Sequence, residues 1–148
     1  MKKLDLITLA TKKKLNSKNK RKNDFEMNET SEIGPVYFDG SKNIYPRVLR
    51  LIDKFIKSLK KRNVRFKFSY YGSYIIIENL DIQFYIKEKN QRVKFINSYG
   101  REESKLEPTG RIRLNIIHNL SKRQWIDGKA SKLENKIEII ADQLIKFA

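Results

Sequence analysis

The amino-acid sequence predicts an α+β fold: a two-layer sandwich in which two helices lie on one face of a four-stranded antiparallel sheet. Apolar residues recur at helical spacing in residues 46–62 and 129–147, and between these segments they alternate with polar residues in four short runs. Consecutive runs of this kind pair as neighbours in most sheets. The 148 residues are enough to bury the core of one domain. We therefore expect a flexible basic N-terminal arm over residues 1–40 and a single domain over residues 41–148.

The N-terminal arm is expected to be largely disordered, with residues 4–9 as a candidate short helix or strand and residues 36–38 as a candidate strand. Residues 12–28 are mostly Lys, Arg, Asn and Ser, with Leu15, Phe25 and Met27 as the apolar exceptions. Such a segment has too little apolar surface to offset the entropy lost on ordering. A cationic segment binds phosphates by releasing counterions, although a mere flexible tail remains the alternative. The candidate phosphate contacts here are Lys12, Lys13, Lys14, Lys18, Lys20, Arg21 and Lys22.

The two helices are predicted from apolar stripes. The first helix begins near Pro46, because proline suits the first turn of a helix. Its stripe repeats every three or four residues and consists of Val48, Ile52, Phe55, Ile56 and Leu59. The second stripe, near the end of the chain, consists of Leu133, Ile137, Ile140, Ala141 and Leu144.

The four strands are predicted where apolar and polar residues alternate. Gly72 and Ser73 turn the chain between the first and second strands, and residues 79–81 make a tight connection to the third. Residues 89–108 are expected to form a loop that carries Arg92. The predicted strands are residues 64–69, 74–78, 82–87 and 111–116.

The sheet face turned away from the helices is predicted to carry cations and a tyrosine but no carboxylate. It would display Arg65, Lys67, Gln83, Tyr85, Lys87, Arg111, Arg113 and Asn115. Cations attract phosphates and an aromatic ring stacks on bases, which is how single-stranded nucleic acids bind to open sheets. The alternative interpretation is a solvated face, because a face in contact with water must be polar.

The composition narrows the chemistry. The chain has 33 Lys and Arg against 17 Asp and Glu, a net charge of +16, which favours polyanionic partners. It has no Cys and one His, so we expect no thiolate metal site, no cysteine nucleophile and no cofactor. The sequence also lacks an apolar run long enough to span a membrane, and we expect a cytoplasmic protein.

Three stretches of sequence stand out as a set: Lys87, Glu88 and Lys89 with Arg92 and Val93; Pro108, Thr109, Gly110 and Arg111 with Ile112 and Leu114; and Trp125, Asp127, Gly128 and Lys129 with Leu133 and Glu134. Together they resemble the C-terminal domain of uncharacterised bacterial proteins carried on plasmids and other mobile elements. The resemblance spans from Pro46 to the end of the chain. Members of that group usually carry an N-terminal region that looks like a helix-turn-helix, and here the basic arm stands in its place. The resemblance implies association with DNA and supplies no catalytic residue.

The sequence as a whole favours a small non-catalytic nucleic-acid-binding protein of a mobile element or defence locus. A protein-interaction adaptor or effector that binds an acidic protein partner is the alternative, and an uncovered apolar patch near Tyr70, Tyr71 and Tyr74 would favour it. A metal-dependent nuclease is less favoured. Asp81 could supply one metal-binding carboxylate, but residues 87–90 do not place a lysine at the offset that this chemistry needs. The choice between DNA and RNA stays open.

Overall fold

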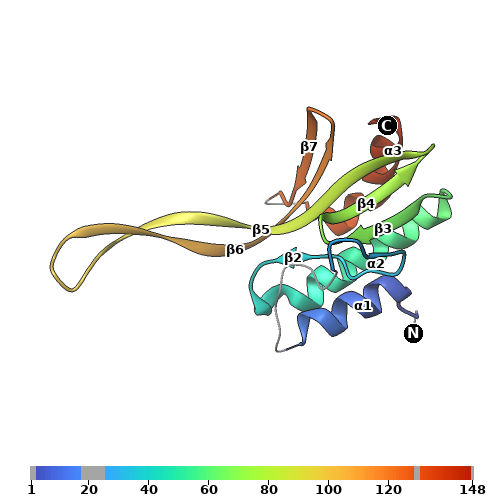
Figure 1. Cartoon of the computed structure of the whole chain (residues 1–148). Coiled ribbons are helices and arrows are strands. Elements are labelled where there is room, and N and C mark those ends of the chain that lie inside the picture. Colours follow the sequence, from blue (N-terminus) through green and yellow to red (C-terminus); the bar gives the residue numbers. More distant parts are fainter. Residues whose placement is uncertain (1–2, 18–25, 129–130, 148) are drawn as a thin grey trace.

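The computed structural model of the chain describes residues 3–17, 26–128 and 131–147. Its helices and strands follow one another in a mixed order (Figure 1). They are α1 (Leu6–Leu15), β1 (Thr30–Ser31), β2 (Phe38–Asp39), a 3-10 helix (Lys42–Ile44), α2 (Tyr45–Lys61), β3 (Arg65–Ser69), β4 (Gly72–Ile77), β5 (Leu80–Ile96), β6 (Glu102–His118), β7 (Ser121–Ile126), a second 3-10 helix (Leu133–Lys136) and α3 (Ile137–Phe147).

The described residues form one sheet of seven strands, so the prediction of a four-stranded sheet with two helices is wrong although the α+β class holds. Six strands pair antiparallel in the order β1-β3-β4-β5-β6-β7. The short strand β2 pairs parallel with β5, with Phe38 opposite Ile86. The sequence did not indicate β1, because two residues are too few to show a period, and the candidate strand at residues 36–38 overlaps β2 at Phe38 alone. It missed β7 because the polar run Ser121–Gln124 does not alternate with apolar residues.

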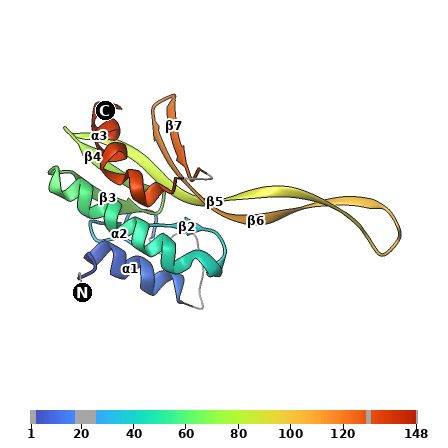
Figure 2. The same cartoon turned by 180° about the vertical axis from the view of Figure 1, so that it is seen from behind.

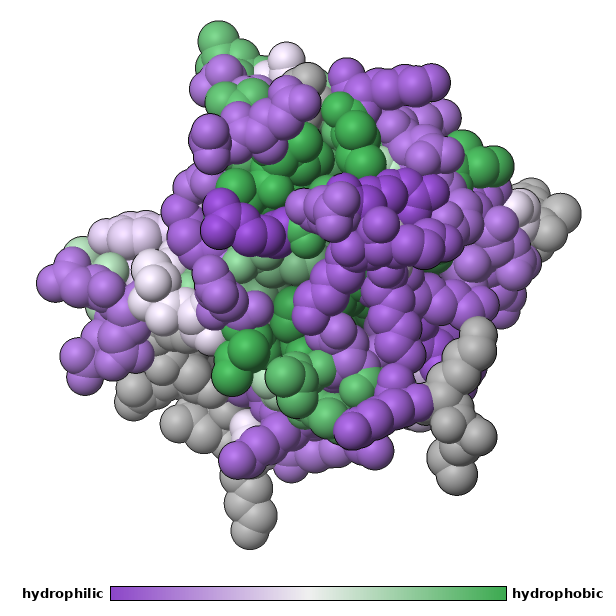
Figure 3. All heavy atoms as spheres, turned by 90° about the vertical axis from the view of Figure 1, so that its right-hand side faces the viewer, coloured by the Kyte–Doolittle hydropathy of each residue, from purple (hydrophilic) through white to green (hydrophobic). Residues whose placement is uncertain are grey.

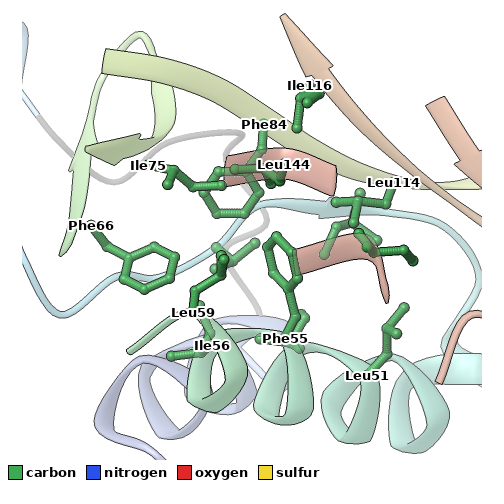
Figure 4. Packing of buried hydrophobic residues seen from close by; sticks show 14 of the residues in the cluster. Leu51, Phe55, Ile56, Leu59, Phe66, Ile75, Phe84, Leu114, Ile116 and Leu144 are labelled. Atoms are coloured by element: carbon green, nitrogen blue, oxygen red, sulfur yellow. The ribbon is translucent and has the colours of Figure 1, made fainter. Parts of the chain in front are cut away.

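Helices α2 and α3 pack against one face of the sheet, here called the inner face, and the opposite face is the outer face (Figures 1 and 2). In α2 the predicted stripe is buried, and the ring of Phe55 lies 5.7 Å from the ring of Phe84 on β5. Leu144 of α3 lies beside them in the same core (Figure 4). The last helix begins later than residue 129, since α3 starts at Ile137 after a 3-10 turn. At the end of the molecule that faces away from the long extension of β5 and β6, apolar patches lie among hydrophilic side chains (Figure 3).

Part of the N-terminal segment is folded onto the domain, which corrects a second prediction. Residues 6–15 form α1, and Ile7 is fully buried in the same core as the sheet and α2. The buried face of α1 also contains Thr8 and Thr11, whose hydroxyls donate to Asp53 Oδ1 and to the Ile7 carbonyl at 2.9 and 2.8 Å. Because two of its inward residues are threonines, this face resembled a solvated segment in the sequence.

Residues 89–108 are not a loop, which is a third correction. Strands β5 and β6 continue past the sheet as a twisted two-stranded extension, and its residues 90–108 are here called the ribbon (Figures 1 and 2). Its pairing runs from Asn90 opposite Pro108 to Ile96 opposite Glu102. With no layer packed on it, the ribbon needs no continuous apolar face, and the strand period was therefore weak in the sequence.

Candidate nucleic-acid interface

The polar residues predicted for the outer face do share one side of the sheet. Along β3 and along residues 82–88 of β5 and 112–116 of β6, every second residue is buried on the inner face, and the residues between them lie on the outer face. Tyr85 lies opposite Asn115, and Lys87 lies opposite Arg113. Strand β7 adds Gln124 to the row that contains Tyr85 and Asn115, since Gln124 lies opposite Asn115.

Tyr85 lies between two clefts of the outer face. The first, here called the tyrosine cleft, has a volume of about 260 Å³. It lies near the point where β5 stops pairing with β4 and begins to pair with β2. Burial raises the pKa of Tyr37 above its usual value and Asp39 adds to the shift, so this phenol stays neutral. Aromatic rings and hydrogen-bonding side chains in one hollow suit a planar base. The lining includes Tyr37, Asp39, Tyr71, Gln83, Tyr85 and Lys87.

The second hollow, here called the donor cleft, has a volume of about 330 Å³ and lies between β5, β6 and β7. Arg113 and Asn115 line it, and Arg113 Nε and Asn115 Nδ2 are buried and lack a hydrogen-bond partner among the described residues. Leaving a buried donor in this condition costs roughly 1–3 kcal/mol, so a small rotation of either side chain toward an acceptor oxygen in the cleft would be favoured. The polar lining is completed by Tyr85, Lys122, Arg123 and Gln124.

The two clefts differ in the charged side chains that line them. Arg113, Lys122 and Arg123 line the donor cleft without any carboxylate, whereas Asp39 lines the tyrosine cleft. A phosphate is therefore favoured in the donor cleft, and a base, whose amino groups can donate to a carboxylate, is favoured in the tyrosine cleft. Lys87 Nζ lies 5.3 Å from the centre of the Tyr85 ring, so a cation accompanies the shared aromatic residue.

The other predicted cations of the sheet are engaged elsewhere or lie apart. Lys67 forms an ion pair with Asp81, and the Arg111 guanidinium donates from Nε and Nη2 to the Asp127 carbonyl at 3.0 and 2.6 Å. Arg65 is exposed on β3. Arg92 is on the ribbon, where it donates to Ser104 Oγ at 2.9 Å. Arg113 and Lys87 are thus the predicted cations that line the clefts.

The N-terminal candidates belong to a different part of the molecule. Lys12, Lys13 and Lys14 occupy the last turn of α1, which packs on α2 rather than on the sheet (Figures 1 and 2). They do not join the clefts of the outer face. The remaining four predicted residues, Lys18, Lys20, Arg21 and Lys22, lie outside the described residues.

A buried ion cluster fixes the root of the ribbon. Arg47 of α2 donates to Asp127 Oδ1 at 2.6 Å, to both oxygens of Glu134 at 2.7 and 2.8 Å, and to the Gly110 carbonyl at 3.1 Å. The two carboxylates raise the pKa of Arg47. Burial alone would raise the pKa of Asp127, but hydrogen bonds from Arg47 and from the N–H groups of Ile112 and Leu133 outweigh it and lower that pKa. The cluster ties α2, β6 and the start of the last helical segment together.

The three stretches that carry the resemblance meet at this root. Buried Glu88 accepts from the N–H groups of Gly110 and Ser41 at 2.7 and 2.8 Å, and Asp127 accepts from Ile112 N–H at 2.8 Å. Gly110 has a φ of +75°, a conformation that favours glycine, at the irregularity where the pairing of β5 and β6 shifts register. These residues therefore support the direction in which the ribbon leaves the sheet.

Several cleft residues were not among the sequence candidates. Tyr37, Tyr71, Lys122, Arg123 and Gln124 line the two clefts. The sequence signal that could have located them was Asn119, because asparagine is common in turns. In the structure Asn119 has a φ of +55° and lies in the turn between β6 and β7. Recognising that turn would have placed Lys122 and Gln124 beside the outer face of β6.

The chain matches no known protein-family model, no curated protein and no solved structure. Among the helices in the described ranges, none has the length and apolar character needed to cross a membrane. Within those same ranges no three His, Asp or Glu side chains are grouped so that they could hold a metal ion.

Proposed function

We propose that this chain is a non-catalytic protein that binds single-stranded nucleic acid on the outer face of its sheet. A base lies in the tyrosine cleft against Tyr85, and the adjoining phosphate accepts hydrogen bonds from Arg113 and Asn115 in the donor cleft. Lys87, Lys122 and Arg123 supply the surrounding positive charge. The resemblance to mobile-element proteins extends the proposal to a mobile element or defence locus as its setting.

One observation carries the proposal: two buried, unpartnered donors share a cationic cleft with a tyrosine whose other side lines an aromatic hollow. Burial without a partner is costly for both nitrogens, and a phosphate in the donor cleft would supply acceptor oxygens once the two side chains turn toward it. A single strand can place a base in one cleft and its phosphate in the other, whereas a duplex keeps its bases paired and stacked.

The test is a fluorescence titration of the full chain with labelled single- and double-stranded DNA and RNA of one length, at two salt concentrations. Tyr85→Ala should weaken single-strand affinity by about 1–3 kcal/mol through lost stacking, with the salt dependence unchanged. Arg113→Ala should instead lower the slope of log affinity against log salt by roughly 0.7, the share of one phosphate contact.

Matched controls separate the clefts from general charge and exposure. Tyr99→Ala removes a tyrosine that is 87% exposed at the ribbon tip, and Arg50→Ala removes a cation from α2 on the helical side. Both variants should bind single strands as the wild-type chain does. Equal losses in Tyr85→Ala and Tyr99→Ala, or equal slopes in Arg113→Ala and Arg50→Ala, would show that the clefts are not the binding site.

An acidic protein partner is the second candidate, because Tyr70 and Tyr71 are 45% and 59% exposed at the turn between β3 and β4. Their rings pack edge to face at 5.3 Å and form a small aromatic patch on a cationic protein. Tyr70 does not line either cleft, so Tyr70→Ala distinguishes the two candidates. It should weaken binding of a glutamate-rich peptide only if this second function is correct, and should leave nucleic-acid affinity unchanged in either case.

A further inference from the structure

The ribbon is the least supported part of the described structure. It consists of two strands with no covering layer, and it exposes Ile96 at 69% and Leu106 at 59%. Two-stranded hairpins are marginally stable in water, and an unpaired strand edge is a template for another strand. The hydrogen bonds at the root hold the ribbon in an orientation that points away from the rest of the molecule. This arrangement indicates that the ribbon contacts a partner.

Charge argues that this partner is not nucleic acid. Residues 90–108 contain four basic and three acidic side chains, a net charge of +1 in a chain of net charge +16. The acidic residues, Glu102, Glu103 and Glu107, are all on β6. A polyanion would be drawn to the body, whereas a nearly neutral ribbon allows two cationic bodies to meet at a distance from each other.

The β6 edge of the ribbon is complementary to itself. Arg101, Glu103, Lys105 and Glu107 alternate in sign at every second position around Ser104, and they share one face of the ribbon. When two copies of this segment run antiparallel with Ser104 opposite Ser104, Glu103 lies opposite Lys105 and Arg101 lies opposite Glu107. Each match occurs twice because of the two-fold symmetry.

We propose that two copies of this chain associate through residues 101–107, edge to edge, so that two ribbons form one four-stranded antiparallel sheet. The association does not depend on nucleic-acid binding by the outer face.

The backbone groups suit this register. Asn97 N–H donates to the Arg101 carbonyl at 2.9 Å and closes the hairpin. The antiparallel ladder alternates from that pair, so the N–H and C=O groups of residues 102, 104 and 106 point away from β5. In the Ser104-centred register, residue 102 bonds to residue 106 of the second copy, and the two Ser104 residues bond to each other. Residues 103 and 105 then form the non-hydrogen-bonded pairs, in which side chains lie closest.

The neighbouring centres at residues 103 and 105 place like charges together. A centre at residue 103 sets Glu103 against Glu103, and a centre at residue 105 sets Lys105 against Lys105. The β5 edge of the ribbon carries Arg92 and Lys94 without a carboxylate between residues 89 and 96, so two β5 edges repel. Pairing of a β5 edge with a β6 edge would not close and would generate open chains of molecules.

The test is sedimentation of the full chain over a concentration series, with charge reversal at the proposed edge. The wild-type chain should reach a dimer, twice 17.6 kDa, and no larger species. Glu103→Lys places lysine opposite Lys105 twice and should raise the dissociation constant by at least about tenfold. The double variant Glu103→Lys with Lys105→Glu restores opposite charges in both pairs and should recover the dimer.

Glu32→Lys is the control, because it makes the same change in net charge at an exposed site before β2. It should dimerise as the wild-type chain does. A monomer at every concentration, larger assemblies, or a double variant as weak as Glu103→Lys would each overturn the proposal. The double variant also controls for the loss of the Asn97 Nδ2 bond to Glu103, because both variants lack that bond. Replacing Lys105 removes its ion pair with Glu107 at 3.3 Å as well, but that pair is exposed and contributes little to stability.

Discussion

Replacing Asp127 with asparagine tests whether the ion cluster at the ribbon root stabilises the fold. The Asp127 carboxylate is 3% exposed and accepts hydrogen bonds from Arg47 at 2.6 Å, Ile112 N–H at 2.8 Å and Leu133 N–H at 2.9 Å. Asparagine keeps the size of the side chain but removes the charge and turns one acceptor oxygen into a donor. At least one of the three donors must then face another donor.

The size of the effect follows from these contacts. Breaking a buried ion pair costs about 3–5 kcal/mol, but Arg47 would keep its two bonds to Glu134, so we expect a loss of about 2–4 kcal/mol in the free energy of unfolding. For a domain of this length the midpoint of thermal unfolding should fall by about 6–12 °C. Circular dichroism measures it. Glu138→Gln is the control, because Glu138 is 59% exposed in its pair with Arg62 and should shift the midpoint little.

The pH dependence supplies a second readout of the same variant. The folded-state pKa of Asp127 is lowered, so its stabilising contribution is complete above the unfolded pKa of about 3.9 and is lost as pH falls through the folded pKa. The gap between the wild-type chain and Asp127→Asn should therefore be largest near neutral pH and should shrink in acid. If the unfolding midpoint of Asp127→Asn lay within about 2 °C of the wild-type midpoint at neutral pH, the ion cluster would not stabilise the fold as described.

Two further predictions concern stability elsewhere. Ile7→Ala should lower the free energy of unfolding by about 2–4 kcal/mol in a urea titration, because Ile7 is fully buried, whereas Leu6→Ala on the exposed side of α1 should change it little; equal effects would mean that α1 does not pack as described. Gly110→Ala should cost about 1–3 kcal/mol, because its φ of +75° is held by hydrogen bonds to Glu88 and Arg47. Gly100→Ala, with the same φ at the ribbon tip, should leave the global midpoint nearly unchanged, and a large shift there would contradict this local role.

Much of the inner and outer surface of the sheet could be predicted from residue spacing. Phe66, Phe84 and Leu114 are buried on one face, and Tyr85 and Arg113 lie on the other, because side chains alternate along any strand whatever it pairs with. The same local rule identified the stripe of α2. For α1 it offered only residues 4–9 as a short helix or strand, since Thr8 and Thr11 are buried only because Asp53 and the Ile7 carbonyl accept their hydrogen bonds.

The candidate site depended on contacts that spacing does not reveal. Nothing in the local sequence distinguishes Arg111 from Arg113, yet the first donates to the Asp127 carbonyl while the second has a buried nitrogen in the donor cleft. Tyr37, next to β2, lines the tyrosine cleft, and Lys122 of β7 lines the donor cleft. The sequence did not show that these two segments lie beside β5 and β6.

The α+β class, the position of α2, the alternation of the central strands and the strong positive charge can all be predicted from the sequence, because each depends on composition or on residues close together in the chain. The folded chain was needed to show that residues 90–108 are a ribbon, that α1 joins the core, and that Tyr85 lies between two clefts. These features arise from partners far apart in sequence, such as Arg47 with Glu134 and Glu88 with Gly110, and such pairs exist only once the chain has folded.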